Sequence, residues 1–155
     1  MEIVIRTVLV GIGATIVLDL WALLLNRAFN VPLPNWAMVG RWVGNMPTGK
    51  FAHENTQAAP AVPGERPLGW AVHYAVGIAF ATLLVLVFGV GWLRNPTPIP
   101  ALILGVVTVV SPYFILQPGM GMGIAASRTP KPNVVRLRSL MNHFVFGVGL
   151  FVAGW

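Results

Sequence analysis

Long runs of hydrophobic residues alternate with shorter polar stretches along this chain. Four runs extend over residues 3–25, 69–93, 99–116 and 139–155. A membrane-spanning helix needs about 20 mostly apolar residues, and inside lipid its backbone groups must be paired within the segment. The pattern therefore predicts an all-α fold, a bundle of four transmembrane helices that forms a single integral membrane domain over residues 1–155.

The long stretch between the first two predicted helices, residues 26–68, has two parts of different character. About residues 34–46, Trp36, Val39 and Val43 fall on one side of a helix, and Trp42 is a second tryptophan suited to the headgroup region. We therefore expect a short interfacial helix there, lying on the membrane surface. The remainder is rich in Pro, Ala and Gly and is too polar to enter lipid.

The composition agrees with a membrane environment. Hydrophobic residues make up 56% of the chain and charged residues 9%, with a mean hydropathy of +0.76. A soluble domain carries roughly 25% charged residues, so the lipid bilayer is the expected solvent and first partner. The sequence has no cysteine, which excludes disulfides, thiolate nucleophiles and cysteine-ligated metal clusters.

The positive charge lies beside the apolar runs. The net charge is +6, from ten Lys and Arg against four Asp and Glu. There is no basic amphipathic helix or aromatic–basic module, so we expect no nucleic-acid partner. Eight basic residues lie in or beside the two long loops, and only Arg6 and Arg94 lie on the other side. The eight are Arg27, Arg41, Lys50, Arg66, Arg128, Lys131, Arg136 and Arg138. The positive-inside rule then predicts that both long loops are cytoplasmic and that both chain ends lie on the opposite side of the membrane.

This topology gives a depth to each polar residue inside the predicted helices. At ~1.5 Å rise per residue, Asp19 lies ~9 Å from the cytoplasmic end of its helix, and His73 and His143 each lie ~6 Å from theirs. Tyr113 and Gln117 end the third helix at the same level. These five residues are therefore predicted to form one polar layer that opens toward the cytoplasm.

Helical spacing places these groups on faces rich in small residues. The four stripes are Gly11, Thr15 and Asp19; His73, Gly77 and Ala81; Ala101, Gly105 and Thr108; and Ser139, His143 and Gly147. Small residues at such spacing let helix backbones approach closely in lipid. The sequences HYAVG (73–77) and HFVFG (143–147) also match, which suggests a parallel pseudo-twofold repeat of helix pairs.

The chemistry of this layer has several interpretations. An ionisable residue within a membrane helix is a functional candidate, and the expected partner of Asp19 is His73 or His143. The alternative is a carboxylate that only stabilises helix packing. The histidines are candidates for proton carriers, metal or heme ligands, hydrogen-bonding core residues, or direct contacts of a substrate or quinone. Two histidines and a carboxylate form a known metal-binding set, so Asp19, His73 and His143 are also the metal-ligand candidates.

The long loop contains a second titratable cluster. His53, Glu54 and Glu65 can complete the site if the loop folds over the bundle, whereas a solvated loop is the alternative. No motif identifies a cofactor, a substrate or a catalytic reaction. Whether the protein is an enzyme is therefore left open by the sequence.

The motifs LDLWALLL, PNWAMVGRWVG, GWAVHYAVGIAFA and SLMNHFVFGVG together resemble a group of small four-helix bacterial inner-membrane proteins, a domain of unknown function (DUF2938). The resemblance covers most of the chain and implies the four-helix architecture without an activity. Two functional hypotheses follow from the residues. In the first, the polar layer binds a small molecule, ion or proton. The alternative is a non-catalytic accessory or assembly subunit whose partners are other membrane subunits or a second copy of the chain.

Overall fold

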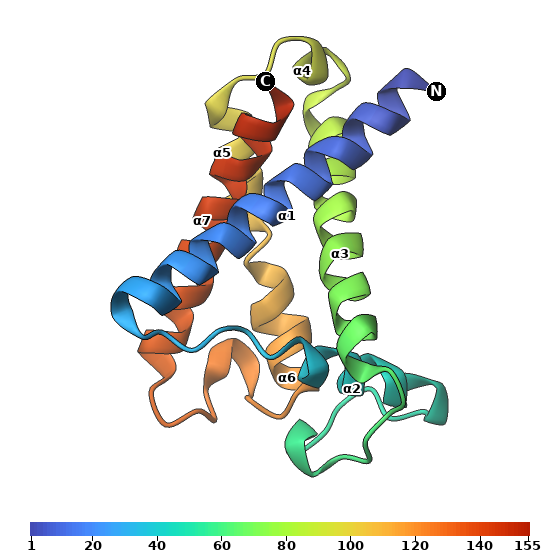
Figure 1. The fold of residues 1–155 in the computed structure, drawn as a ribbon, viewed down its shortest axis with the longest axis vertical. Coiled ribbons are helices and arrows are strands. Elements are labelled where there is room, and N and C mark those ends of the chain that lie inside the picture. Colours follow the sequence, from blue (N-terminus) through green and yellow to red (C-terminus); the bar gives the residue numbers. More distant parts are fainter. The chain divides into compact units, whose positions relative to one another are not determined.

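The computed structural model describes residues 1–155, and all of its regular elements are helical. Four helical stretches are long and apolar enough to cross a membrane, by length and composition (Figure 1). They are α1 (Glu2–Phe29), α3 (Glu65–Phe88), the stretch Pro98–Gly119 and α7 (Pro132–Gly154). The predicted fold class, an all-α protein with four such helices, is confirmed.

The second and fourth helices begin earlier in the chain than the hydrophobic runs. α3 begins at Glu65 and ends at Phe88, where Gly89 has the left-handed φ of 83° that commonly ends a helix. The short helix α4 (Gly91–Arg94) follows. α7 begins with Pro132, a residue well suited to the first helical position. Hydropathy alone misses both starts because the first turns of these helices are polar.

The third apolar stretch is not a uniform α-helix. It consists of α5 (Pro98–Val107), a π-helical turn η3 (Pro112–Leu116) and the short α6 (Gln117–Gly119). Pro112 has no N–H to donate and its ring crowds the preceding turn, so a regular ladder of hydrogen bonds cannot pass through it. A π-helical turn is one way in which a helix accommodates such a break.

The remaining elements are short and lie mostly in the two long connections. Helix α2 covers Trp36–Asn45, within the stretch expected to lie on the membrane surface. That location stays a prediction. Three 3₁₀ turns complete the structure: η1 (Met46–Thr48), η2 (Thr56–Ala58) and η4 (Ile124–Ala126).

The chain divides into two compact units, and the single integral domain expected from the sequence stays a prediction. Unit 1 comprises Met1–Pro34, Tyr74–Thr108 and Met141–Trp155, and unit 2 comprises Asn35–His73 and Val109–Leu140. Helices α3 and α7 each contribute residues to both. The core of unit 1 consists of small and branched apolar side chains together with aromatic ones: Val10, Ala14, Ala81, Leu84, Trp92, Leu93, Ala101, Leu104, Phe146 and Leu150.

Both chain ends lie at the same end of unit 1, beside α4 (Figure 1). The Arg6 guanidinium donates a hydrogen bond to the carbonyl oxygen of Leu93 at 3.3 Å. At the other chain end, a Cβ atom at Gly154 would lie 2.8 Å from the indole of Trp92. These contacts fix the connection between α3 and α5 against the two chain ends.

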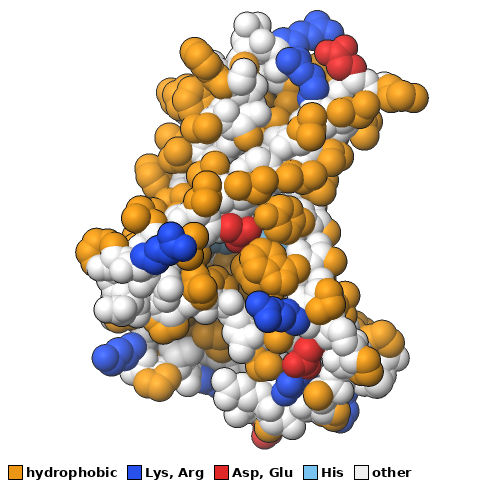
Figure 2. Space-filling view, viewed as in Figure 1, with side chains coloured by type: hydrophobic (Ala, Val, Ile, Leu, Met, Phe, Trp, Pro, Cys, Tyr) orange, Lys and Arg blue, Asp and Glu red, His pale blue; other side chains and the backbone are white.

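The outer surface of α1 is strongly apolar. Figure 2 shows hydrophobic side chains over most of the α1 face that is turned toward the viewer. The large apolar side chains exposed along this helix are Ile3, Val4, Ile5, Leu9, Ile16, Leu20, Leu24 and Phe29. A contiguous apolar surface of this kind is unusual for a soluble monomer and is suited to lipid.

Candidate functional site

Two close crossings between helices shape the interior of unit 1, and the first joins α1 to α3. A Cβ atom at Gly11 would lie 2.5 Å from the Cα atom of Ile78, and one at Gly77 would collide with the Thr15 hydroxyl. The buried Thr15 Oγ1 donates to the Gly11 carbonyl oxygen at 2.8 Å. The crossing therefore requires the absence of a side chain at both glycines.

The second crossing joins α5 to α7 in a similar way. A Cβ atom at Gly105 would lie 2.5 Å from the Cα atom of Gly147. The Thr108 hydroxyl donates to the Gly105 carbonyl oxygen at 2.7 Å, as Thr15 does to Gly11. Most of the small and hydroxyl residues of the predicted stripes are buried, whereas Ser139 is only half-buried. The buried ones are Gly11, Thr15, Gly77, Ala81, Ala101, Gly105, Thr108 and Gly147.

Both glycines of the two matching sequences, Gly77 of HYAVG and Gly147 of HFVFG, take part in these crossings. Gly77 of α3 contacts Gly11 of α1, and Gly147 of α7 contacts Gly105 of α5. On each earlier helix a threonine follows the glycine within four residues. This correspondence favours the repeat of helix pairs, which itself stays a prediction.

Asp19, the only carboxylate between the ends of α1, interacts with the neighbouring helix. The Tyr74 hydroxyl of α3 donates a hydrogen bond to Asp19 Oδ2 at 3.0 Å. Both side chains are half-buried. The hydrogen bond orients the carboxylate. The expected pairing of Asp19 with a histidine stays a prediction.

His143 of α7 contacts α5 through its Nδ1 atom. Nδ1 lies 3.0 Å from Thr108 Oγ1 and 3.3 Å from the Gly105 carbonyl oxygen. Thr108 already donates its single hydroxyl proton to that same carbonyl. The Thr108 hydroxyl oxygen and the Gly105 carbonyl oxygen are then both acceptors for Nδ1, which must carry the proton. We therefore assign the Nδ1–H tautomer to neutral His143.

This assignment leaves Nε2 of His143 with a free lone pair. No hydrogen-bond partner for Nε2 is present in the structure, and the ring is bordered by Phe80, whose centroid lies 6.2 Å away. A histidine whose Nδ1 is held by a carbonyl oxygen while Nε2 is free is oriented to accept a proton or bind a cation. The His143 side chain is half-buried.

Asp19 and His143 lie on the same side of the crossing between α1 and α7. The two helices run in opposite directions. They cross closely at Ala14 and Gly149, where a Cβ atom at Gly149 would lie 2.9 Å from Ala14 Cα. Asp19 follows Ala14 by five residues, and His143 precedes Gly149 by six. Each residue is therefore displaced ~8–9 Å along its own helix from the crossing, toward the same end of unit 1.

The other three members of the predicted polar layer belong to unit 2. His73 stacks on Trp36 of α2, with ring centroids 3.8 Å apart and an interplanar angle of 24°. The ring of Trp70 lies edge-on to His73 at 5.8 Å. One imidazole face is therefore occupied by an indole.

Tyr113 lies in the π-helical turn and Gln117 follows it directly, and both contact α7. The Tyr113 hydroxyl donates to the Arg136 carbonyl oxygen at 2.7 Å. Gln117 is 4% exposed, and its Nε2 donates to Ser139 Oγ at 3.1 Å. Its Oε1 has no hydrogen-bond partner in the protein. Gln117 thus keeps one buried acceptor for a water molecule or a ligand atom.

The three candidate residues of the long loop, His53, Glu54 and Glu65, differ in their hydrogen bonds and burial. Glu65 accepts two hydrogen bonds from Arg41, to Oε2 from Nε and to Oε1 from Nη2, each at 2.8 Å. These hydrogen bonds raise the pKa of the Arg41 guanidinium. The backbone N–H of His53 donates to Gly119 at 2.9 Å, and its buried Nε2 has no partner. The Glu54 side chain is exposed.

Within either unit, no three side chains among His, Asp and Glu are placed to hold one metal ion. The metal site predicted from Asp19, His73 and His143 therefore stays a prediction. Neither Tyr74 nor Arg41 is among the site residues predicted from the sequence. Tyr74 could have been found, because it follows His73 directly and lies at the depth expected for Asp19.

Together, the fold and these polar groups define a small all-helical protein with four candidate membrane spans and ionisable residues on its apolar helices. The family model described as "Protein of unknown function (DUF2938)" matches residues 8–155, and the chain belongs to this family. The resemblance inferred from the sequence motifs is thereby confirmed. Comparison with curated proteins and with solved structures gives no match.

Proposed function

We propose that this chain is a multi-pass protein of the bacterial inner membrane, with both long loops in the cytoplasm and both chain ends on the opposite side. The four apolar helices and the apolar surface of α1 support a membrane location. The excess of Lys and Arg in and beside the two long connections supports the orientation.

The absence of cysteine makes this orientation directly testable. Ala52 and Asn95 are exposed residues in the connections expected on opposite sides of the membrane. In intact bacterial cells, a membrane-impermeant maleimide should label the Asn95→Cys variant and leave Ala52→Cys unlabelled until lysis. The reverse pattern, or equal labelling of both variants in intact cells, contradicts the proposed orientation.

We further propose that the protein binds a small molecule, ion or proton at a polar site among its apolar helices. The observation that carries this proposal is the Asp19 carboxylate, which lies within the apolar helix α1 and accepts a hydrogen bond from Tyr74. Inserting a helix with such a carboxylate into a membrane costs about 2.5–3.5 kcal/mol of insertion free energy. Asp19 is therefore expected to have a functional role.

Within unit 1 the polar residues have different chemical roles at the proposed site. Asp19 supplies negative charge, and Tyr74 fixes the direction of the carboxylate. His143 offers Nε2 as a proton acceptor or ligand atom, because Thr108 and Gly105 engage Nδ1. The participation of His73, Tyr113 and Gln117 rests on the depth predicted from the sequence.

The test compares Asp19→Asn with Glu2→Gln, a matched control that neutralises the exposed carboxylate at the start of the same helix. Both variants and the native protein are purified in mild detergent. Native mass spectrometry, elemental analysis and an absorption spectrum then report bound metal, pigment or small molecule. Carboxyl infrared spectra over a pH series report proton binding at Asp19.

We expect a bound species or a titrating carboxyl signal in the native protein and in Glu2→Gln, and its loss in Asp19→Asn. Identical results for all three proteins contradict the proposed binding site. A stoichiometric membrane partner that co-purifies equally with all three proteins, without any other bound species, favours the alternative role as an accessory or assembly subunit.

A further inference from the structure

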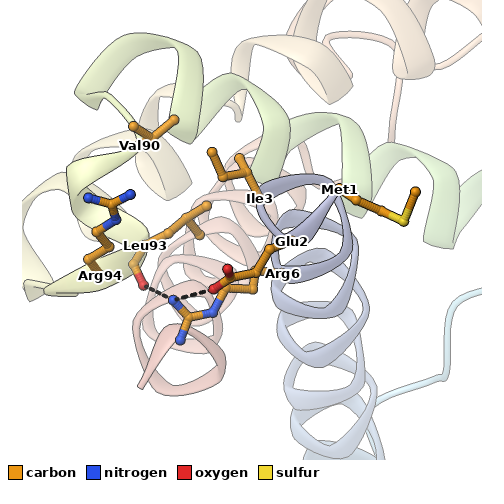
Figure 3. Close-up of a pocket in the computed structure, with 7 residues that line it drawn as sticks. All are labelled: Met1, Glu2, Ile3, Arg6, Val90, Leu93 and Arg94. Atoms are coloured by element: carbon orange, nitrogen blue, oxygen red, sulfur yellow. Dashed lines mark hydrogen bonds and ion pairs between the residues drawn. The ribbon is translucent and has the colours of Figure 1, made fainter.

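We propose that the cavity between the start of α1 and the α4 connection binds the phosphate group of an anionic phospholipid. This cavity lies in unit 1 and has a volume of about 150 Å³. It is lined by Met1, Glu2, Ile3, Arg6, Val90, Leu93 and Arg94 (Figure 3). The inference rests on the membrane location proposed above and does not involve Asp19.

The walls of the cavity combine guanidinium groups with apolar side chains. Arg6 lines it from α1 and Arg94 from the last residue of α4, with Ile3, Val90 and Leu93 beside them (Figure 3). The two arginines are the only basic residues on this side of the predicted topology. A phospholipid presents the same combination of a phosphate group and an apolar chain.

The hydrogen-bonding capacity of the arginines is largely unused. Arg6 Nη1 donates to Leu93 at 3.3 Å and lies 4.0 Å from Glu2 Oε1, in an exposed pair. Arg94 has no hydrogen-bond or ion-pair partner in the structure, and its side chain is exposed. An arginine presents five N–H donors in a planar fork that matches the geometry of phosphate oxygens.

The charge of the cavity fits a phosphate diester. Two arginines and one glutamate leave a net charge of +1 among the side chains, which complements the single negative charge of a phosphatidylglycerol headgroup. The position also fits. The cavity lies where α1 begins and where α3 and α4 end, so it is at the end of the apolar helices, which is the depth of lipid headgroups.

The test is a lipid titration of the detergent-solubilised protein followed by native mass spectrometry. Phosphatidylglycerol, zwitterionic phosphatidylcholine and inorganic phosphate are the three probes. We expect one phosphatidylglycerol to bind in preference to phosphatidylcholine. Arg94→Gln is expected to weaken this binding about tenfold, through the loss of one charge-assisted contact. Because Arg94 has no partner in the protein, this variant should fold as well as the native chain.

The matched control is Arg27→Gln, which removes an exposed charge from the other end of α1 and should bind phosphatidylglycerol normally. The proposal is overturned if Arg94→Gln and Arg27→Gln behave alike, or if phosphatidylcholine binds as well as phosphatidylglycerol. Displacement of the lipid by millimolar inorganic phosphate also overturns it, since the site would then recognise free phosphate. Failure of the native protein to bind either lipid also overturns the proposal, whereas the membrane location is tested separately by the maleimide labelling described above.

Discussion

The hydroxyl of Tyr74 donates a 3.0 Å hydrogen bond to the carboxylate of Asp19, and this contact joins α3 to α1 in unit 1. It lies on the same face of α1 as the crossing formed by Gly11 and Thr15. The carboxylate is therefore oriented by a group on a helix whose distance from α1 is fixed by the nearby glycines.

Replacing Tyr74 with Phe should lower the free energy of unfolding by about 0.6 kcal/mol, the average for a hydrogen bond between membrane helices. The same change should shift the infrared carboxyl signal of Asp19, identified by its loss in Asp19→Asn. Tyr113→Phe is the control, since that hydroxyl donates to the Arg136 carbonyl oxygen. A carboxyl signal that responds equally to both variants would contradict the assigned contact.

The tautomer of His143 provides a second test. In protein labelled with ¹⁵N-histidine, the neutral ring of His143 should show a protonated Nδ1 and an unprotonated Nε2. Thr108→Val removes the nearest acceptor while preserving the side-chain shape, and should shift the Nδ1 resonance and destabilise the protein by about 1 kcal/mol.

The control for this experiment is Thr82→Val. The Thr82 hydroxyl is exposed and donates only to Ile78 of its own helix. We expect this change to alter stability by less than about 0.5 kcal/mol and to leave the His143 resonances unchanged. A protonated Nε2 in the native protein would show that the hydrogen-bond arrangement at Thr108 is reversed.

The α5–α7 crossing should be intolerant of even a methyl group. Gly105→Ala places a Cβ atom 2.5 Å from the Cα of Gly147, where only backbone movement relieves the overlap. We expect destabilisation of about 1–3 kcal/mol in thermal or denaturant unfolding. Gly91→Ala is the control, because a Cβ there meets no atom within 4 Å. Equal stability of the two variants would mean that α5 and α7 are not held by this contact.

In unit 2, the paired hydrogen bonds between Arg41 and Glu65 join α2 to the first turn of α3. Arg41→Lys keeps the charge but cannot form two parallel hydrogen bonds. Limited trypsin digestion should therefore cleave faster after the exposed Lys50, which lies in the segment between these helices. Arg66→Gln, at the exposed neighbouring position, should digest like the native protein, and an unchanged rate in Arg41→Lys would argue against the role of this pair.

The four helices were predictable because a run of about 20 apolar residues has few other stable conformations. Their buried faces were also predictable, since Gly11, Gly77, Gly105 and Gly147 mark positions where the backbones of two apolar helices approach closely. The polar starts of α3 and α7 could not be found in this way. Hydropathy measures transfer into lipid, whereas the first turn of a helix is determined by its local capping and packing.

The contacts of the polar residues were harder to predict than their depth. Depth follows from residue number, but the direction of a side chain depends on the rotation of each helix. His73 and Tyr74 are consecutive residues of α3, so their side chains leave the helix in different directions. Of the two, Tyr74 donates the hydrogen bond to Asp19. The ring of His73 instead stacks on Trp36, a residue of α2 whose packing against α3 does not follow from its own helical pattern.

Each glycine crossing joins two long apolar segments that are consecutive in the chain, α1 with α3 and α5 with α7. The Gly11–Gly77 crossing needs no residue beyond α3, and the Gly105–Gly147 crossing needs none before α5. Because the chain leaves the ribosome N-terminus first, the α1–α3 pair can form before the α5–α7 pair is available. In the proposed membrane location each pair can enter the bilayer as a hairpin, and the contact between Ala14 and Gly149 then joins the two pairs.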